Sequence, residues 1–590
     1  MTAPAPAAEA AFHAWEPGLE PGLPRALMPL ATVFRPETTA LPLAEILELA
    51  DLSGLSPVRL APIRAERLAV HELLIRVMAD YSVPVGEVYA DLGVNFRAMV
   101  STIWRDGIAA RMGAVEAALD ALRTEAGEIL GRELALLLDG EAEAPPPAPR
   151  RLFGLLPGKP VPVPAVDGLA RALTRLDGRC AEAEGLEGAV REALRGVVAA
   201  VIARQGTLIR DRALLARLAL ILVANREGSR RIGALIEPWI AAAAEARGYR
   251  RLAAQAEPVV MTVKGASASG KSTIRPYQRD LAGRIGADWS DFAVVTPDVW
   301  RKFLLDYDGL GPLRRYAGPL AGHEIEIVDA KLDRHITAKA AGGSVSHLLI
   351  DRFRFDSFST GPNGDGTGGL LTRFGQRVYL QFMVTPPEET VERAWKRGEE
   401  FGRYKAVEDL LAHNVEAYSG MPRLFFTWAL RQDRAVFYEF LDNAVPKGAR
   451  PLTIAFGTNG AMTILDARAL LAIERYRRID IRARSPAEVY RGAEPDPAQD
   501  AGFLRAILRR IATVRFAEPA TGRVVARFEG GRLAGLDRPR LEALRADPAM
   551  AEALAAAGLG SESAATCPDL DEVVRPEHAA TLGDWGATRG

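Results

Sequence analysis

The spacing of apolar residues divides the chain into regions of different texture. In 61–140 and again in 166–255, apolar residues recur three and four positions apart, which predicts amphipathic helices. From residue 256 onward short β-branched runs alternate with helical stretches, and strands are expected at 259–263, 292–296, 347–351, 378–384 and 451–456. Strands separated by helices are typical of βαβ units around a largely parallel sheet, so 256–480 is expected to be an α/β domain.

The other segments show different patterns. Residues 1–60 are Pro-rich and irregular, and the repeated prolines of 141–165 exclude a helix or central strand and indicate a linker. Residues 481–558 predict a small α+β domain, with a helix at 502–512, a hairpin after it and a helix near 538–557. The tail, 559–590, is expected to be disordered.

Composition narrows the class of protein. At 590 residues the chain is too long for one core, so about two to four domains are expected. A net charge of −1 argues against a general nucleic-acid or membrane-surface binder, although it does not exclude local basic patches. The two cysteines, Cys180 and Cys567, are far apart and predict neither a disulfide framework nor a thiolate zinc site. With no visible signal peptide or membrane span, we expect a cytoplasmic protein.

The most informative motif follows the first expected strand. Residues 265–272, GASASGKS, satisfy G-x-x-x-x-G-K-[ST] between a strand and a helix, which predicts a P-loop. Its amides would surround phosphate oxygens, Lys271 would bridge the β- and γ-phosphates of ATP, and Ser272 would ligate Mg²⁺. The alternative is a Gly/Ser-rich turn with an exposed lysine. Pro276 lies about one turn into the expected helix and predicts a kink there. The residues expected to bind the nucleotide are Gly265, Ala266, Ser267, Ala268, Ser269, Gly270, Lys271, Ser272 and Thr273.

Two residues after the second strand are candidates for the acceptor side of a reaction. Asp298 lies at the strand tip, where a carboxylate could take the proton of a hydroxyl that attacks the γ-phosphate. The alternative role is an N-cap for the next helix. Arg301 would hold an anionic substrate group or pair with Asp298.

Acidic residues further along offer weaker candidates. Glu324, beside His323, lies near an expected helix start and would contact substrate or metal-bound water, or would only complement the helix dipole. Asp351 ends the third strand at a Walker-B-like position and would orient Mg²⁺. Its alternative is a pair with Arg352 or Arg354.

A cationic helix follows the fourth strand. Arg393 and Arg397 lie four residues apart, and Arg403 and Lys405 come soon after, so this segment needs an anionic partner. One interpretation is a lid over the transferring phosphate, and the other is a solvated ion-pair network. The Gly-rich stretch 359–369 is either a substrate loop or a surface connection.

Taken in order, these motifs resemble the zeta-toxin-like branch of the P-loop small-molecule kinases over about 257–465. The matching elements are GxxxxGKS, the strand-two TPDVWRKFL, the HE at 323–324, HLLID and the lid segment ERAWKRGEEFGRY. The resemblance implies ATP and Mg²⁺ as cofactors and phosphorylation of a hydroxyl, in the best-known members on a UDP-amino-sugar. It also implies roles for individual residues. Lys271 and Ser272 would bind phosphate and metal, and Asp298 would be the base. Arg301 and Glu324 would contact the substrate, and Arg397 and Arg403 would clamp the phosphates.

The chain departs from that family at two places. Strand two lacks a second acidic residue, and LLIDRFRFDSF replaces the expected acidic-Gly-Thr ending, so the acceptor stays open. The loop is also similar to that of uridine kinases, and an Asp after strand two recurs in polynucleotide 5′-hydroxyl kinases.

The expectation is therefore an α/β P-loop kinase-like domain, preceded by a mostly helical N-terminal region and followed by a small α+β region. Its partner would be a small molecule with a hydroxyl group. The alternatives are a P-loop ATPase or nucleotide-dependent switch that acts on the helical region, and an interaction protein with a degenerate nucleotide site. The N-terminal helices are expected either to restrain the kinase in cis or to serve as an oligomerisation or scaffold module.

Overall fold

The fold was taken from a computed structural model that describes residues 12–88, 90–139, 173–174, 176–181, 183–351, 371–560 and 568–586. The expected linker at 141–165 and the Gly-rich stretch at 359–369 lie outside these residues, as do Arg352, Arg354 and Cys567.

Long helices dominate the N-terminal region, as the apolar spacing predicts. The first 60 residues are less irregular than expected, because Ile46 and Leu49 bury one face of a helix that ends at Gly54 in the left-handed conformation. The helices described here are α1 (Leu43–Ser53), α2 (Pro57–Leu60), α3 (Ala65–Asp80), α4 (Asp91–Ile103), α5 (Met112–Asp139), α7 (Gly185–Gln205), α8 (Arg212–Val223) and α9 (Ser229–Ala246).

The rest of the described chain is built on one mixed sheet of ten strands, in the order β10-β9-β8-β7-β6-β5-β4-β1-β3-β2. The five strands from β2 to β5 along this order are parallel, and antiparallel pairs predominate beyond β5. The protein is therefore of the α/β class. The strands are β1 (Val259–Lys264), β2 (Phe292–Val295), β3 (His347–Ile350), β4 (Arg377–Val384), β5 (Ala435–Asp442), β6 (Leu452–Thr458), β7 (Ala461–Ile464), β8 (Thr513–Ala517), β9 (Val524–Glu529) and β10 (Arg532–Leu536).

All five expected strands are present, and the short β7 and the long β5 are additional. β5 pairs in parallel along its whole length with β4, yet the sequence does not signal it as clearly as the others. The physical reason is that β5 buries the Glu439 carboxylate in the middle of its apolar run and ends at a second buried carboxylate, Asp442.

Helices cover the sheet on both faces. Around its parallel part lie α10 (Arg275–Arg284), α11 (Arg301–Leu304), α12 (Ala317–Ala341), α13 (Pro387–Phe401) and α14 (Val407–Ala429). The C-terminal helices are α15 (Ala467–Tyr476), α16 (Pro486–Val489), α17 (Pro497–Asp500), α18 (Gly502–Arg510), α19 (Arg538–Leu544) and α20 (Pro548–Ala556).

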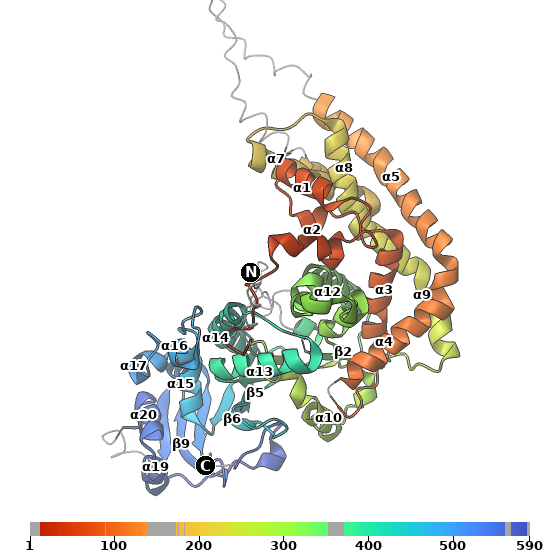
Figure 1. The fold of residues 1–590 in the computed structure, drawn as a ribbon. Helices are drawn as coiled ribbons and strands as arrows, with labels where there is room; N and C mark the ends of the chain where they lie inside the picture. The colour runs from red at the N-terminus through yellow and green to blue at the C-terminus, as the bar shows by residue number, and fades with distance from the viewer. Residues whose placement is uncertain are drawn as a thin grey trace, which may run out of the picture.

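The N-terminal helices share a core with one face of this sheet. Buried residues of α3, α4 and α9 form a single cluster with those of β1, β2, β3 and α12. Figure 1 shows α3 and α4 beside α12 and β2, whereas α5, α7 and α8 extend away from the sheet. The helical region is thus packed directly against the α/β part of the chain.

The C-terminal segments also join this architecture. The stretch 481–558, expected as a separate small domain, supplies β8 to β10 to the same sheet, because β8 pairs in parallel with β7. Residues 568–586, expected in a disordered tail, pack onto it as well. Leu582 is fully buried there, and its N–H donates to the buried Glu439 carboxylate. Burial raises the pKa of Glu439 to about 7.

Among the described residues, no helix is both long and apolar enough to cross a membrane.

Candidate phosphate-binding site

The loop 265–272 lies where the sheet changes direction. β1 has β3 on one side and β4 on the other, and the chain leaves β1 toward β2 and β3 before crossing to β4 and β5. Open α/β sheets bind ligands at such a switch point, outside the carboxyl ends of the strands. The loop follows the carboxyl end of β1, so it lies at this position.

The backbone of the loop requires its small residues. A Cβ at Gly265 would lie 2.9 Å from the Met383 carbonyl oxygen, and one at Gly270 would lie 2.1 Å from the Asn443 Nδ2. Gly270 has φ +93°, and Ala268 has φ +62°, which is uncommon for a residue with a side chain. The chain is turned sharply here and is held in a strained conformation, which is typical of functional sites.

This turn leaves backbone donors unused. Among the described residues, the N–H groups of Ser267, Ala268 and Gly270 find no acceptor in the protein. Successive amides in a turn with left-handed residues form a concavity that binds anions. The loop therefore offers three hydrogen-bond donors to an anionic ligand.

Two residues missed by the sequence reasoning hold the loop in place. The Ser269 carbonyl accepts hydrogen bonds from the Thr385 hydroxyl at 3.0 Å and from the Asn443 Nδ2 at 2.8 Å. Both follow the carboxyl ends of neighbouring parallel strands, β4 and β5, and that position is the signal that would have indicated them.

Lys271 lies over its own loop. Its Nζ donates to the carbonyl oxygens of Gly265 at 3.1 Å and Ala266 at 2.7 Å. Burial lowers the pKa of Lys271 to about 8, with Asp351 opposing that shift and Arg397 adding to it. The ammonium group is thus held where the unused amides are, and an anion there would favour its charged form.

The helix after the loop begins later than expected. Residues 271–274 form a 3₁₀ turn, η7 (Lys271–Ile274), and α10 starts at Arg275, so Pro276 lies in its first turn. No helical hydrogen bond is lost there, and the expected kink is replaced by this change of helix type.

The Ser272 hydroxyl and the Asp351 carboxylate are in contact at 2.6 Å, as a shared metal role requires. Arg275, which the sequence did not indicate, donates to the same carboxylate oxygen at 3.2 Å. A hydroxyl and one carboxylate next to a phosphate loop are oxygen ligands of the kind that Mg²⁺ prefers, so these residues fit the ion. Among the described residues no group of three or more His, Cys, Asp or Glu side chains could hold a metal by itself.

Asp298 and two arginines form a charged cluster near Lys271. The Asp298 carboxylate accepts from Arg301 at 3.0 Å and from Arg403 at 2.5 Å, and it caps no helix. The Asp298 side chain is 48% exposed, and the guanidinium groups of Arg403 and Arg301 hold its pKa well below the usual range of an aspartate. Arg301 also donates to the Gly318 carbonyl oxygen, so the expected pair with Asp298 is present, and its role toward a substrate stays a prediction.

The cationic helix reaches the same site. The charge of Arg397, on α13, lowers the pKa values of Lys271 and Asp298 and of Lys405, which lies just beyond the helix. Arg393 has a structural part instead, since it donates to the Asn443 and Val445 carbonyl oxygens after β5.

The structure gives Glu324 a different place from the expected substrate site. Its side chain is fully buried on α12 and accepts hydrogen bonds from two α3 residues, Arg67 and His71. His323 is exposed and pairs with Glu326. Glu324 therefore anchors the N-terminal helix α3, and His323 takes no part in that contact.

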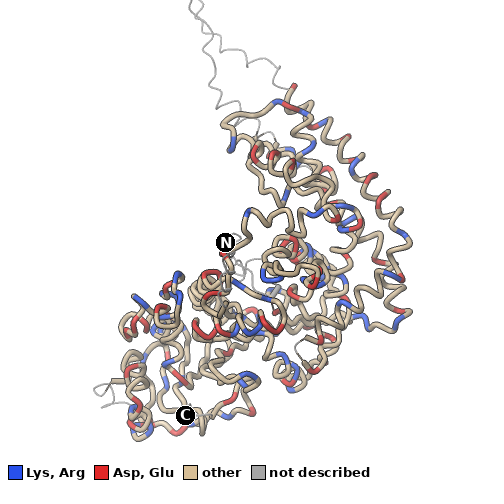
Figure 2. Tube along the Cα trace, viewed as in Figure 1, with Lys and Arg blue, Asp and Glu red and all other residues tan. Residues whose placement is uncertain are grey.

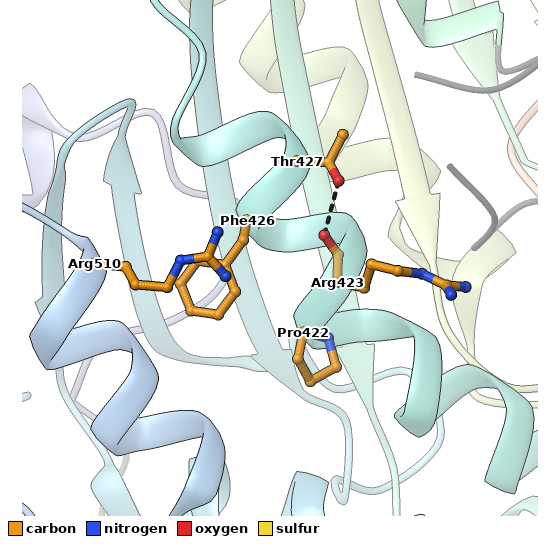
Figure 3. Close-up of a pocket in the computed structure, with 5 residues that line it drawn as sticks. All are labelled: Pro422, Arg423, Phe426, Thr427 and Arg510. Atoms are coloured by element: carbon orange, nitrogen blue, oxygen red, sulfur yellow. Dashed lines mark hydrogen bonds between the residues drawn. The ribbon is translucent and has the colours of Figure 1, made fainter. Parts of the chain in front are cut away.

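Charge is otherwise evenly distributed, with both signs along the whole described trace (Figure 2). A second pocket between α14 and α18 (Figure 3) shares no lining residue with the site, and its Arg510 guanidinium lies 4.0 Å from the centre of the Phe426 ring.

Comparisons with protein-family models, with curated proteins and with solved structures find no match for this chain. The functional argument therefore depends on the geometry of the site.

Proposed function

We propose that the chain is an ATP-dependent phosphotransferase that moves the γ-phosphate of ATP to the hydroxyl of a small molecule. The observation that carries this proposal is the loop at the sheet's switch point, which combines unused amides, the Lys271 ammonium and the Ser272–Asp351 pair. A P-loop kinase-like α/β domain of the zeta-toxin-like kind accounts for all three.

Each residue has a role that follows from its contacts. The loop amides and Lys271 would bind the phosphates, and Ser272 and Asp351 would hold Mg²⁺, which would neutralise charge on the β- and γ-phosphates. To meet the phosphates, Lys271 gives up its two hydrogen bonds to the loop carbonyls. Its charge then compensates the ligand in a partly buried setting, where electrostatic interactions are strong.

Asp298 would orient the attacking hydroxyl. A carboxylate whose pKa is held far below neutrality is a weak base, so it would accept the hydroxyl hydrogen bond and take the proton late in the transfer. Loose transition states for phosphoryl transfer need little base strength. Arg403 and Arg397 would stabilise negative charge on the transferring group, and their closeness to Asp298 puts acceptor and donor sides together.

The test is transfer from γ-labelled ATP to a metabolite extract, with identification of the labelled product. Wild type is expected to label a small molecule, and Lys271→Ala is expected to lose both ATP binding and transfer while it keeps its far-ultraviolet circular dichroism. Asp298→Asn is expected to bind ATP normally but to transfer at least about a hundredfold more slowly.

The rival reading is an ATPase or nucleotide switch. Release of ADP and phosphate without any labelled acceptor, at a rate that Asp298→Asn does not change, would favour the rival.

A further inference from the structure

A pocket lies between the N-terminal helix α4 and the end of β2. From α4 it is lined by Leu92, Gly93 and Arg97, and from the α/β part by a group that includes Asp298 and Lys302. The residue proposed to orient the acceptor hydroxyl therefore shares a pocket with the N-terminal helices.

This pocket carries an excess of positive charge. Five cations line it, Arg97, Arg275, Arg301, Lys302 and Arg403, against the single carboxylate of Asp298. Arg301 and Arg403 are paired with Asp298, and Arg275 is paired with Asp351. Within the described part of the chain, Arg97 and Lys302 form no ion pair within 4 Å, and the charge of Asp308 acts on Lys302 only from a distance.

The surroundings of Arg97 and Lys302 increase the cost of leaving them unpaired. Burial lowers the pKa of Arg97, and burial together with the charge of Arg97 lowers the pKa of Lys302. Arg97 is half-buried and Lys302 is exposed, and two cations whose fields overlap at the lining of one pocket favour a bound anion.

The position of Arg97 is fixed by packing. Gly93, one turn earlier, lies against the Arg97 side chain and faces Val299 beyond β2, since a Cβ there would lie 3.0 Å from the Arg97 Nη1 and 3.8 Å from the Val299 Cγ1. Phe96 and Val100 of the same helix are buried in the core shared with the sheet. The guanidinium is thus presented by a docked helix and not by a mobile loop.

We infer that Arg97 of α4 is a substrate-binding residue of the acceptor pocket, and that the acceptor carries an oxyanion, a phosphate or a carboxylate, besides its hydroxyl. This inference rests on the proposed function. It makes the N-terminal helices part of the substrate site, with Arg97 and Lys302 holding the anionic group while Asp298 orients the hydroxyl.

The first experiment separates the metabolite extract on an anion exchanger and offers the bound and unbound fractions with γ-labelled ATP. The labelled product is expected from the bound fraction. Treating that fraction with phosphatase before the assay shows whether the anionic group is a phosphate or a carboxylate. The treatment abolishes labelling of a phosphorylated acceptor and leaves labelling of a carboxylated acceptor unchanged. Label that arises only from the unbound fraction overturns the inference.

The second experiment measures the kinetic constants of Arg97→Ala. The KM for the acceptor fraction is expected to rise roughly 10- to 100-fold, the value of one hydrogen-bonded charge, while the KM for ATP stays unchanged. Arg97→Lys is expected to recover part of the loss. The matched control is Arg105→Ala, whose side chain is 65% exposed and pairs with Asp106. An unchanged acceptor KM in Arg97→Ala overturns the inference, even where Lys271→Ala still abolishes ATP binding.

A third measurement does not require turnover. Equilibrium dialysis with labelled inorganic phosphate, on protein saturated with a non-hydrolysable ATP analogue and Mg²⁺, is expected to find a site in wild type and Arg105→Ala and none in Arg97→Ala. If wild type binds the analogue but shows no phosphate site, the inference about Arg97 is overturned and the proposed function is not. If wild type does not bind the analogue at all, the proposed function is overturned together with the inference.

Discussion

The most decisive perturbation outside the phosphate loop is Glu324→Ala. Its carboxylate accepts from the Arg67 Nε at 2.5 Å, the Arg67 Nη2 at 2.8 Å and the His71 Nε2 at 2.8 Å. The Lys331 Nζ lies 3.0 Å from the His71 Nδ1, so a neutral His71 accepts from Lys331 and donates to Glu324. Burial lowers the pKa of His71 to about 4, with the charge of Lys331 acting in the same direction, which agrees with that tautomer.

The expected magnitude follows from burial. The side chains of Glu324 and His71 are both 0% exposed and that of Arg67 is 14% exposed. Removing one partner of a buried ion pair leaves the other charge without compensation, which typically costs about 3–5 kcal/mol. We expect Glu324→Ala to lose free energy of unfolding in that range, and to loosen α3 from α12 most of all.

Two measurements check this prediction. Denaturant titration gives the shift of the unfolding midpoint, and native-state hydrogen exchange gives the local opening of α3 and α12. Glu326→Ala, two residues further along the same helix with a side chain that is 75% exposed, is the control and is expected to change little. If Glu324→Ala unfolds like wild type but loses binding of the acceptor, the anchoring role is refuted and the substrate role implied by the family resemblance returns.

Three further outcomes are expected. The pKa of Lys271 without ligand is about 8, and a bound polyphosphate raises it, so ATP binding should take up about half a proton at pH 8 and almost none at pH 6.5. Calorimetry in buffers of different ionisation enthalpy measures this proton uptake, and proton release would contradict the prediction. His335 and Lys339 hold the pKa of Asp80 near 2 although burial opposes this, so the carboxylate stabilises the fold by about 2 kcal/mol above about pH 4 and loses that contribution as the pH falls toward 2. The difference in free energy of unfolding between wild type and Asp80→Asn should therefore be smaller at pH 3 than at pH 7. Deletion of 1–250 should give insoluble protein, because it uncovers the buried faces of β2 and α12, and a soluble product with normal ATP turnover would be the contrary result.

Local signals account for what the sequence predicted well. The loop 265–272 and the strand before it are contiguous, so glycine positions and β-branched runs carry the information. Asp298 and Asp351 are brought to this end of the sheet because residues that follow parallel strands meet at the same edge, whereas Arg403 follows α13 and reaches Asp298 from there. The pairing of Ser272 with Asp351 follows from the same rule.

The parts that sequence reasoning missed depend on contacts between distant segments. From the local sequence, Glu324 is interpreted as a site residue, because its partners Arg67 and His71 lie on α3, more than 200 positions earlier. Arg97 lies in a helix whose pattern indicates only an apolar face, and no spacing links it to Asp298. β5 was obscured by Glu439, whose partners are the Thr453 hydroxyl and the backbone of the C-terminal segment.

The packing of the N-terminal helices restricts how they would act on the proposed kinase. A detachable inhibitor needs an interface whose two sides tolerate water, yet α3 buries Leu68, Leu73 and Val77 in the same core as the sheet. The charges of this interface, including Glu324, are buried and paired, so separation would leave them without partners as well. A regulatory mechanism in which the whole N-terminal region detaches from the sheet would therefore cost much free energy. Movement of α4 alone would also uncover part of this core, because Phe96 and Val100 are buried in it, so we expect α4 to act as a fixed wall of the pocket that contains Asp298.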